Sequence, residues 1–507
     1  MEKKPQVHVA EQEDVYPSGT QLWLQPPSPQ SNCVESLCLE EAIPSPNDPL
    51  NWPSIRRSAL LYAVGFNSFL AAALAPILAT GLPGISSTYE VSMAKSSFTI
   101  GVYMLGLGVG AAVWAPTASL FGRRPVYVLG SVLLIISSAW AAASPSFPSL
   151  VLARLVQGIA ASPGEFLVSV TVSEIYTPQE RGFRLGIYML LLAGGKSLAP
   201  LIGAAVIQSL GWRWVLWVIA IASAACFIGM FLLARETFWS RDEDDITNPG
   251  QLYTANLRIS PPLRYSQALS LFNGRLHPSS WFKLAIKPLP MLKSIPLLYA
   301  SSIYALSLGC LVILAETIAH LFQSVDGYGF NALQTGLLYI SPLLGTIIGS
   351  VIGGKLSDLF AKRSAARNKG VYEPECRLVM MLPGILITVT GLAIYGWSIE
   401  AKTHWMIPTV AFGAVYCGCI LGAGVGVTYA LDCHGKGSAI DTQVILSLCK
   451  NGHGVAFSLF VVDWVKRTGP RAMFFVLAAI HLLLGALSIP LYVYGRRVRV
   501  KMGKRQC

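Results

Sequence analysis

The chain has 507 residues, of which 53% are hydrophobic and only 13% are charged. Soluble domains carry about 25% charged residues, so this composition excludes an ordinary soluble protein and indicates a membrane protein. The formal net charge of +12 is compatible with nucleic-acid binding, but the distribution of the basic residues, described below, excludes that function.

Apolar runs of roughly 20 residues recur along the chain, which predicts membrane-spanning helices rather than the shorter alternating strands of a barrel. The fold class expected is therefore an all-α membrane protein. Its twelve helices, arranged as two bundles of six, are expected near residues 58–80, 97–120, 126–143, 150–176, 185–209, 212–233, 294–320, 333–359, 378–397, 405–431, 438–462 and 473–493.

The composition between and beyond these runs predicts five segments. They are a disordered cytosolic tail (1–57), a six-helix bundle (58–235), a cytosolic central loop (236–293), a second six-helix bundle (294–495) and a basic cytosolic tail (496–507). The N-terminal segment is polar and Pro-rich and lacks the apolar core of a signal peptide. The acidic run at 242–245 is expected to be a solvated part of the loop.

Lys and Arg residues are unevenly distributed between alternate loops. If both termini lie in the cytosol, the cytosolic segments carry most of these residues and the outer loops carry few. The positive-inside rule therefore predicts cytosolic termini. The same bias accounts for the basic chain without a nucleic-acid partner, and it predicts contacts of the basic loops with anionic lipid headgroups.

Three charged residues stand inside the fourth and fifth apolar runs: Arg154, Glu165 and Lys196. A charge near the bilayer centre costs roughly 2.5–3.5 kcal/mol, so such residues usually face a bundle interior or a watery cavity. Arg154 would either hydrogen-bond backbone carbonyls of neighbouring helices or couple proton movement to transport. Glu165 suits reversible protonation. The alternative is a Glu165–Lys196 ion pair, because the two residues are expected at similar depths in the membrane.

Two further pairs of polar residues occur in the second half. Lys450 and His453 are three residues apart on the eleventh helix, so they share a face and are expected to line a central cavity. Glu316 and His320 are four residues apart near the outer end of the seventh helix, where a pair at the membrane interface is expected; the alternative is a proton site. The sequence contains no Gly-x4-Gly-Lys-Ser/Thr loop, so we expect no nucleotide, cofactor or metal.

The two halves repeat a short motif. Ala115 and Ser119, just before Gly122, have counterparts in Gly354 and Asp358 at a constant offset. Two parallel six-helix repeats are typical of secondary transporters, whose substrate site lies near the membrane midplane between the halves.

These motifs together resemble the major facilitator superfamily, in particular the fungal twelve-span drug:proton antiporters of the multidrug-resistance type. The resemblance covers about 48–499. The loop after the second helix resembles the family's cytosolic gate motif, with the positions Ser119, Gly122, Arg123 and Arg124 and a second-half copy that retains Asp358. Ser119 stands where the family has an acidic residue, which implies a weaker first-half gate.

Two more motifs carry the resemblance. The fourth helix matches at Arg154, Gln157 and Gly158, which implies a role for Arg154 and Gln157 in proton coupling. The fifth helix matches the antiporter motif at Gly186, Gly195, Ala199, Pro200 and Gly203. Ala199 replaces one of the motif's glycines, as Ala204 does another.

The resemblance implies a secondary transporter that exports a drug, toxin or secondary metabolite in exchange for protons by alternating access. Its partners would be a small-molecule substrate, protons and membrane lipids, and it would be a monomer in the plasma membrane and not an enzyme. Two alternatives remain open. One is proton-coupled uptake of a nutrient or of an organic cation such as a polyamine. The other is a membrane sensor or scaffold without transport, for which the departure at Ser119 is the support.

Overall fold

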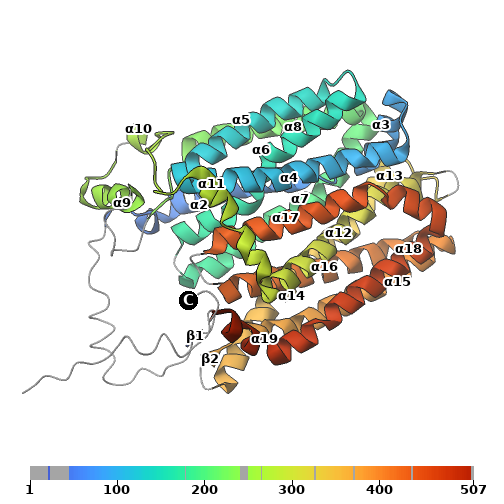
Figure 1. Ribbon diagram of the computed structural model, residues 1–507. Coiled ribbons are helices and arrows are strands. Elements are labelled where there is room, and N and C mark those ends of the chain that lie inside the picture. The colour runs from blue at the N-terminus through green and yellow to red at the C-terminus, as the bar shows by residue number, and fades with distance from the viewer. Residues whose placement is uncertain are drawn as a thin grey trace, which may run out of the picture.

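The computed structural model describes residues 21–22, 45–176, 178–239, 249–263, 265–324, 327–368, 371–434 and 438–503. Helices make up nearly all of this part of the chain and run roughly side by side along one axis (Figure 1). The acidic run at 242–245 lies outside the described residues.

The first half of the chain forms the helices on one side of the molecule. They are η2 (Pro49–Asn51), α2 (Ser54–Ala73), η3 (Ala79–Gly81), α3 (Leu82–Tyr89), α4 (Met93–Phe121), α5 (Arg123–Ala142), α6 (Phe147–Ile175), α7 (Pro178–Leu210) and α8 (Trp212–Leu233). The helix predicted at 58–80 is interrupted after Ala73. Pro76 follows within three residues, and proline lacks the amide hydrogen that a continuing helix requires.

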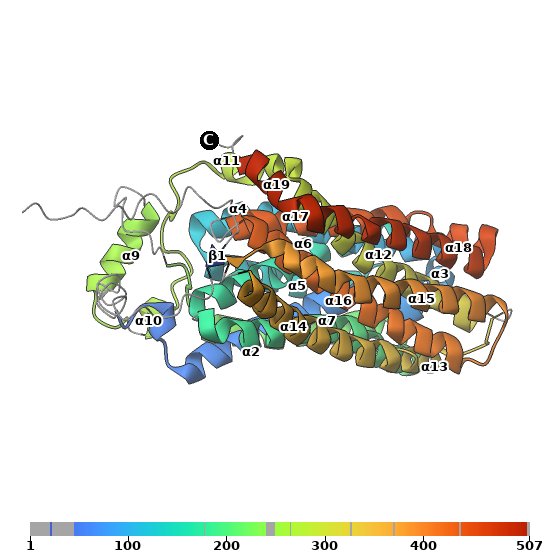
Figure 2. The same cartoon turned by 90° about the horizontal axis from the view of Figure 1, so that it is seen from below.

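Short helices connect the two halves in the region predicted as a loop: α9 (Pro249–Ile259), α10 (Tyr265–Ala268), α11 (Trp281–Ile286) and η4 (Leu289–Lys293). Both views place α9 and α10 at one end of the molecule and α3 at the other (Figure 2). We call these the α9 end and the α13 end, after α9 and the second-half helix α13, which lies at the same end of the molecule as α3.

The second half contains the remaining elements. They are α12 (Ile295–Gln323), α13 (Ala332–Leu337), α14 (Ile340–Arg367), β2 (Val371–Tyr372), η5 (Pro374–Met380), α15 (Met381–Glu400), α16 (Met406–His434), α17 (Ala439–Ser458), α18 (Val461–Ala486) and α19 (Ser488–Gly503). β2 pairs antiparallel with β1 (Gln21–Leu22). The final predicted helix, 473–493, is longer in the structure, because α18 continues through a kink at Gly469 (φ 80°) next to Pro470.

Ten helices or helix pairs in the described part of the chain are long and apolar enough to cross a membrane. Large apolar side chains are exposed on many of them, as expected for surfaces that face lipid rather than water. The multi-helix membrane fold is therefore confirmed. The count of twelve spans stays a prediction for α2 and α17, which are not among the ten.

Among the described residues, the three largest clusters of buried apolar residues are one made mostly of first-half residues and two made almost entirely of second-half residues. The halves meet along α4 and α17, which pack against each other, and along α7, which packs against α13 and α14. Glycines permit this approach: a Cβ at Gly101 on α4 would lie 2.5 Å from Cβ of Ser458 on α17.

Candidate functional site

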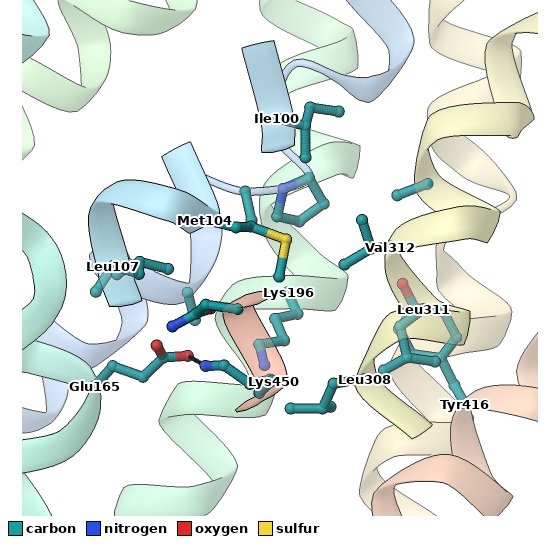
Figure 3. Close-up of a pocket in the computed structure, with 16 residues that line it drawn as sticks. Ile100, Met104, Leu107, Glu165, Lys196, Leu308, Leu311, Val312, Tyr416 and Lys450 are labelled. Carbon is teal, nitrogen blue, oxygen red and sulfur yellow. Dashed lines mark ion pairs between the residues drawn. The ribbon is translucent and has the colours of Figure 1, made fainter. Parts of the chain in front are cut away.

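A small cavity lies between the two halves of the chain, and both halves contribute to its wall (Figure 3). Its volume is about 40 Å³. Its first-half wall comes from α2, α4, α6, α7 and the link after α2, and its second-half wall from α12, α16 and α17. The lining residues are Ala71, Ala72, Ala75, Pro76, Ile100, Met104, Leu107, Glu165, Lys196, Leu308, Leu311, Val312, Ala315, Tyr416, Lys450 and Asn451.

An ion pair joins the two halves at this cavity. The Lys450 ammonium on α17 contacts the Glu165 carboxylate on α6, and their side chains are only 3% and 9% exposed. Tyr188 on α7 donates a hydrogen bond of 2.8 Å to the backbone carbonyl of Glu165, which holds α7 against this part of α6. A buried ion pair is strongly favourable only relative to a state with one partner missing. Its two members therefore depend on each other.

Lys196 also lines the cavity, but it does not form the ion pair with Glu165 that was one of the expectations. Among the described residues no carboxylate lies within ion-pair distance of the Lys196 ammonium, and the partner of Glu165 is Lys450. Figure 3 shows the Lys196 side chain extending toward the Glu165–Lys450 pair. Sequence reasoning gave the depths of the helices but not their rotation, which brings α17 rather than α7 to the carboxylate.

Asn451 adds a second polar group to the cavity wall. Asn451 is 1% exposed, and neither its amide nitrogen nor its amide oxygen has a hydrogen-bond partner in the described structure. Buried amides are nearly always hydrogen-bonded. Asn451 adjoins Lys450, which was predicted to line the cavity together with His453, but Asn451 itself was not among the predicted cavity residues.

His453 does not line the cavity; it is exposed, and its ring lies near that of Phe457 on the same helix. Residues three apart on a helix differ by about 60° in direction. Lys450 points inward to α6, and this difference in direction is enough to place His453 on the outer surface of α17.

Arg154 and Gln157 lie away from the cavity and act as ties between helices. The fully buried Arg154 guanidinium donates to the Leu74 carbonyl (2.8 Å), to the Thr99 carbonyl (3.4 Å) and to Oε1 of Gln157 (2.7 Å). Gln157 in turn donates to Oγ of Ser138 (2.7 Å). The Arg154 guanidinium also lies 4.7 Å from the centre of the Tyr103 ring. These contacts are those expected of the structural alternative for Arg154, and the coupling role stays a prediction.

The glycines of the fifth-helix motif differ in their surroundings. A Cβ at Gly195 would overlap the carbonyl oxygen of Phe69 on α2, and one at Gly203 would lie 2.8 Å from the carbonyl oxygen of Ile77. Gly186 has open space around it. Ala199 and Pro200 are buried. The motif therefore packs α7 closely against α2 and the link after it, except at Gly186.

The predicted gate motif forms a hydrogen-bonded junction at the α9 end. Gly122 (φ 98°) turns the chain, and the backbone amides of Arg123 and Arg124 donate to the Glu236 carboxylate at 2.9 and 3.2 Å. The Arg123 guanidinium also forms a 2.8 Å ion pair with Glu174 at the end of α6. Among the described contacts, the Ser119 hydroxyl donates only to the Ala115 carbonyl of its own helix (3.0 Å). The carboxylates at this junction are those of Glu174 and Glu236.

A related junction occurs in the second half. Arg377 forms a 2.7 Å ion pair with Asp432 at the end of α16 and donates to Oγ of Ser357 (3.0 Å), while the Tyr372 hydroxyl donates to Asp432 (2.5 Å). Burial and the nearby Asp432 carboxylate raise the pKa of Tyr372, so its hydroxyl remains a donor. The side chain of Asp358 lies outside the described residues.

Glu316 is placed differently from the expected interface pair with His320. Glu316 is fully buried. The hydroxyl of Ser458 on α17 donates a hydrogen bond to Oε1 of Glu316, while Oε2 has no hydrogen-bond partner in the described structure. No cationic side chain of the described residues lies within ion-pair distance of it. The interface expectation was wrong because α12 turns this residue toward α17. The signal was an isolated acidic residue in an apolar run.

A family model described as the Major Facilitator Superfamily matches residues 62–440. The chain belongs to this superfamily. Its members are transporters and not enzymes, so the expectation that the chain is not an enzyme is confirmed. It is an integral, multi-pass membrane protein of a family that binds small-molecule substrates.

Fungal members of the superfamily are similar over nearly the whole chain. An efflux pump named radE from Floropilus chiversii is 29% identical, and the match covers 90% of this chain and 83% of the pump. An MFS-type transporter named atr4 from Stereocaulon alpinum is 30% identical, with 90% and 80% covered. Among solved structures, the xylose transporter XylE from E. coli matches with a TM-score of 0.61 at 13% identity, covering 85% of this chain and 98% of XylE.

Proposed function

We propose that this protein is a secondary active transporter that exports a small organic compound in exchange for protons. Export is supported by the name of the similar radE efflux pump and by the resemblance of the fifth helix to the antiporter motif. We further propose twelve spans in two six-helix bundles, residues 58–235 and 294–495. The α9 end and both termini would face the cytosol, and the protein would lie in the plasma membrane.

The observation that carries the proposal is the Glu165–Lys450 ion pair in a cavity shared by the two halves. A tie of this kind can be made and broken by binding events inside the cavity, because each partner is buried and depends on the other. The cavity volume of about 40 Å³ is far below the roughly 300–1,000 Å³ of typical ligand sites. Substrate binding therefore requires the halves to separate at one end.

Opening of the α13 end would break contacts that join the two halves there. Gln323 on α12 donates to the Thr80 carbonyl (3.2 Å), and a Cβ at Gly336 on α13 would overlap Ala204 on α7. Opening at this end would separate these pairs and would also part α4 from α17 near Ser458. Alternating access then consists of exchanging these contacts for a closed α9 end.

Two buried carboxyl groups are candidates for the exchanged proton. Glu165 is ion-paired with Lys450, whereas Glu316 has one neutral donor and one unpaired oxygen. Burial without a cation favours the neutral, protonated form of a carboxyl group. We propose that Glu316 takes up a proton when the α13 end is open and that its burial beside Ser458 then favours closure.

The titratable groups on the helices around Glu316 do not replace a cation partner. They include His320 and Cys310 on α12, His453 on α17, Lys95 on α4, and Lys466 and His481 on α18. Within the described part of the chain, none of them forms an ion pair with Glu316. The protonation of Glu316 would therefore depend mainly on its own exposure.

Flux in sealed vesicles tests the function. Inside-out membrane vesicles with an acidic interior are given a panel of small organic compounds, and accumulation is compared with that after a protonophore removes the gradient. Accumulation of at least one compound driven by the acidic interior is expected. Accumulation driven only by an acidic exterior would instead establish proton-coupled uptake. If the accumulation of no compound depends on the proton gradient, the alternative of a membrane sensor without transport would be favoured.

A further inference from the structure

We propose that the transported compound is an amphipathic organic anion, a carboxylate or phenolate on an apolar body, held by Lys196 and Asn451. This inference rests on the proposed transport function and names the substrate class of the same cavity. It follows from three properties of the wall: an uncompensated ammonium group, an amide without partners, and apolar surfaces around both.

The charges that line the cavity do not balance. Two ammonium groups, Lys196 and Lys450, face one carboxylate, Glu165, and that carboxylate contacts Lys450. Lys196 has no ion pair or hydrogen bond among the described contacts. Lys196 is half-buried. An unpaired charge in an apolar setting is costly, and a bound anion removes that cost. Lys196 is thus the group that gains most from an anionic ligand.

Asn451 provides a separate polar contact. Both of its side-chain polar atoms are buried and unpaired in the described structure, and the residue follows Lys450 on α17. An amide offers one acceptor and two donor hydrogens. It can therefore bind a carbonyl or hydroxyl group next to the anionic group. A site built for such a ligand would reject analogues that leave the amide unpaired.

The remaining wall is apolar. Met104 and Leu107 on α4 face Leu308, Leu311 and Val312 on α12 across the cavity (Figure 3). Burial of apolar surface contributes about 25 cal/mol per Å², so the body of the ligand would supply much of the affinity. Inorganic anions lack such a body and are poor candidates.

The same charge count argues against a polyamine. A cationic ligand would meet two ammonium groups for one carboxylate that is already paired. Like charges within a low-dielectric cavity repel strongly. The uptake alternative is therefore weakest for its organic-cation form.

An anionic substrate also affects where the exchanged proton binds. A proton on Glu165 would free Lys450 and make the cavity more positive, which strengthens rather than opposes anion binding. Exchange requires that proton binding weakens substrate binding. The proton site should therefore lie outside the cavity. Glu316 meets this condition, because it is not among the residues that line the cavity.

Binding of three matched probes to the purified full chain in lipid nanodiscs tests the proposal by calorimetry at pH 7. The probes are 1-naphthoate, neutral 1-naphthamide and cationic 1-naphthylmethylammonium. We expect naphthoate to bind wild type at least tenfold more tightly than either other probe. Lys196→Gln should weaken naphthoate binding at least tenfold and leave naphthamide binding unchanged, and Lys196→Arg should retain the preference. Lys95→Gln, at an exposed lysine on α4, is the matched control.

A second variant distinguishes an anion-binding site from a cation-binding site, because it should change ligand affinity in opposite directions in the two cases. Glu165→Gln releases Lys450 and should tighten naphthoate binding, whereas a cation site would lose affinity. Preference of wild type for the ammonium or amide probe, or unchanged naphthoate binding in Lys196→Gln, would overturn the proposal. Failure of wild type to bind naphthoate in the range of about 1 mM, where the binding free energy is only about −4 kcal/mol, would do so as well. If Lys196→Gln does not fold, the wild-type ranking and Lys196→Arg decide.

These binding measurements use no proton gradient. A protein that binds naphthoate as expected but shows no proton-driven flux would contradict the transport proposal alone. Proton-driven flux of cationic compounds only would contradict the substrate class alone.

Discussion

Glu165 on α6 and Lys450 on α17 form an ion pair across the interface between the two halves, with both side chains more than nine-tenths buried. The two residues are separated by most of the chain, yet they lie at one cavity with Lys196. This relationship makes the pair a connection between the halves as well as a feature of the site.

The first prediction concerns the ion pair. Glu165→Gln or Lys450→Gln leaves an uncompensated buried charge, so each variant should destabilise the protein by up to about 3–5 kcal/mol. The double variant removes both charges and should recover much of that loss. Thermal unfolding of the four proteins in one detergent measures the coupling. Strictly additive losses would show that the two residues do not stabilise each other.

The second prediction concerns Arg154. Its guanidinium ties the Leu74 and Thr99 carbonyls to α6, so Arg154→Gln should leave buried carbonyls unsatisfied and cost about 1–3 kcal/mol for each lost bond. Arg154→Lys should recover only part of this stability, because an ammonium lacks the planar fork. The measurements are unfolding temperature and the pH profile of transport. A normally stable Arg154→Gln protein with an altered pH profile would restore the coupling role.

The third prediction concerns Glu316. Glu316→Gln imitates the protonated side chain, so the protein should fold normally, lose proton-driven flux and retain exchange of labelled for unlabelled substrate. Both fluxes are measured in the same vesicles with a substrate found in the panel. Ser458→Ala, which removes the donor to Oε1 but keeps the carboxyl group, should retain proton-driven flux at a shifted pH. Normal proton-driven flux in Glu316→Gln would exclude Glu316 as the proton carrier.

The fourth prediction uses two glycines of one motif. Gly195→Ala would force a Cβ into the Phe69 carbonyl, so α7 and α2 must move apart and both stability and transport should fall. Overpacking of this kind typically costs about 1–3 kcal/mol. Gly186→Ala is the matched control, because nothing lies within 4 Å of its Cβ position. Equal behaviour of the two variants in unfolding and flux would mean that close packing does not explain the motif.

The fifth prediction concerns Tyr372, which donates to Asp432. Tyr372→Phe should cost about 1.5–3 kcal/mol, as for a hydrogen bond to a charged group. Since the pKa of Tyr372 is raised in the folded protein, this contribution is complete below the unfolded value of about 10 and declines as the pH rises above it. Unfolding temperatures of both proteins between pH 7 and 11 provide the measurement. A difference that grows at alkaline pH would contradict the assigned sign.

Much of the architecture could be derived from residue order alone. The lipid core requires each spanning segment to satisfy its own backbone hydrogen bonds, so apolar length predicted the helices, and Gly122, Arg123 and Arg124 marked a turn between two of them. The cost of a charge in hydrocarbon likewise identified Glu165, Lys196 and Lys450 as residues of an interior site, and all three line the cavity.

The partners of those charges were decided only by the tertiary structure. Depth along a helix follows from residue number, but the direction of a side chain depends on how each helix is rotated against its neighbours. Rotation brought Lys450 rather than Lys196 to Glu165, moved His453 to the surface and turned Glu316 toward Ser458. Apolar periodicity is weak in helices that are apolar on every side. Residue order therefore predicts which charges enter the membrane, and helix packing decides which of them meet.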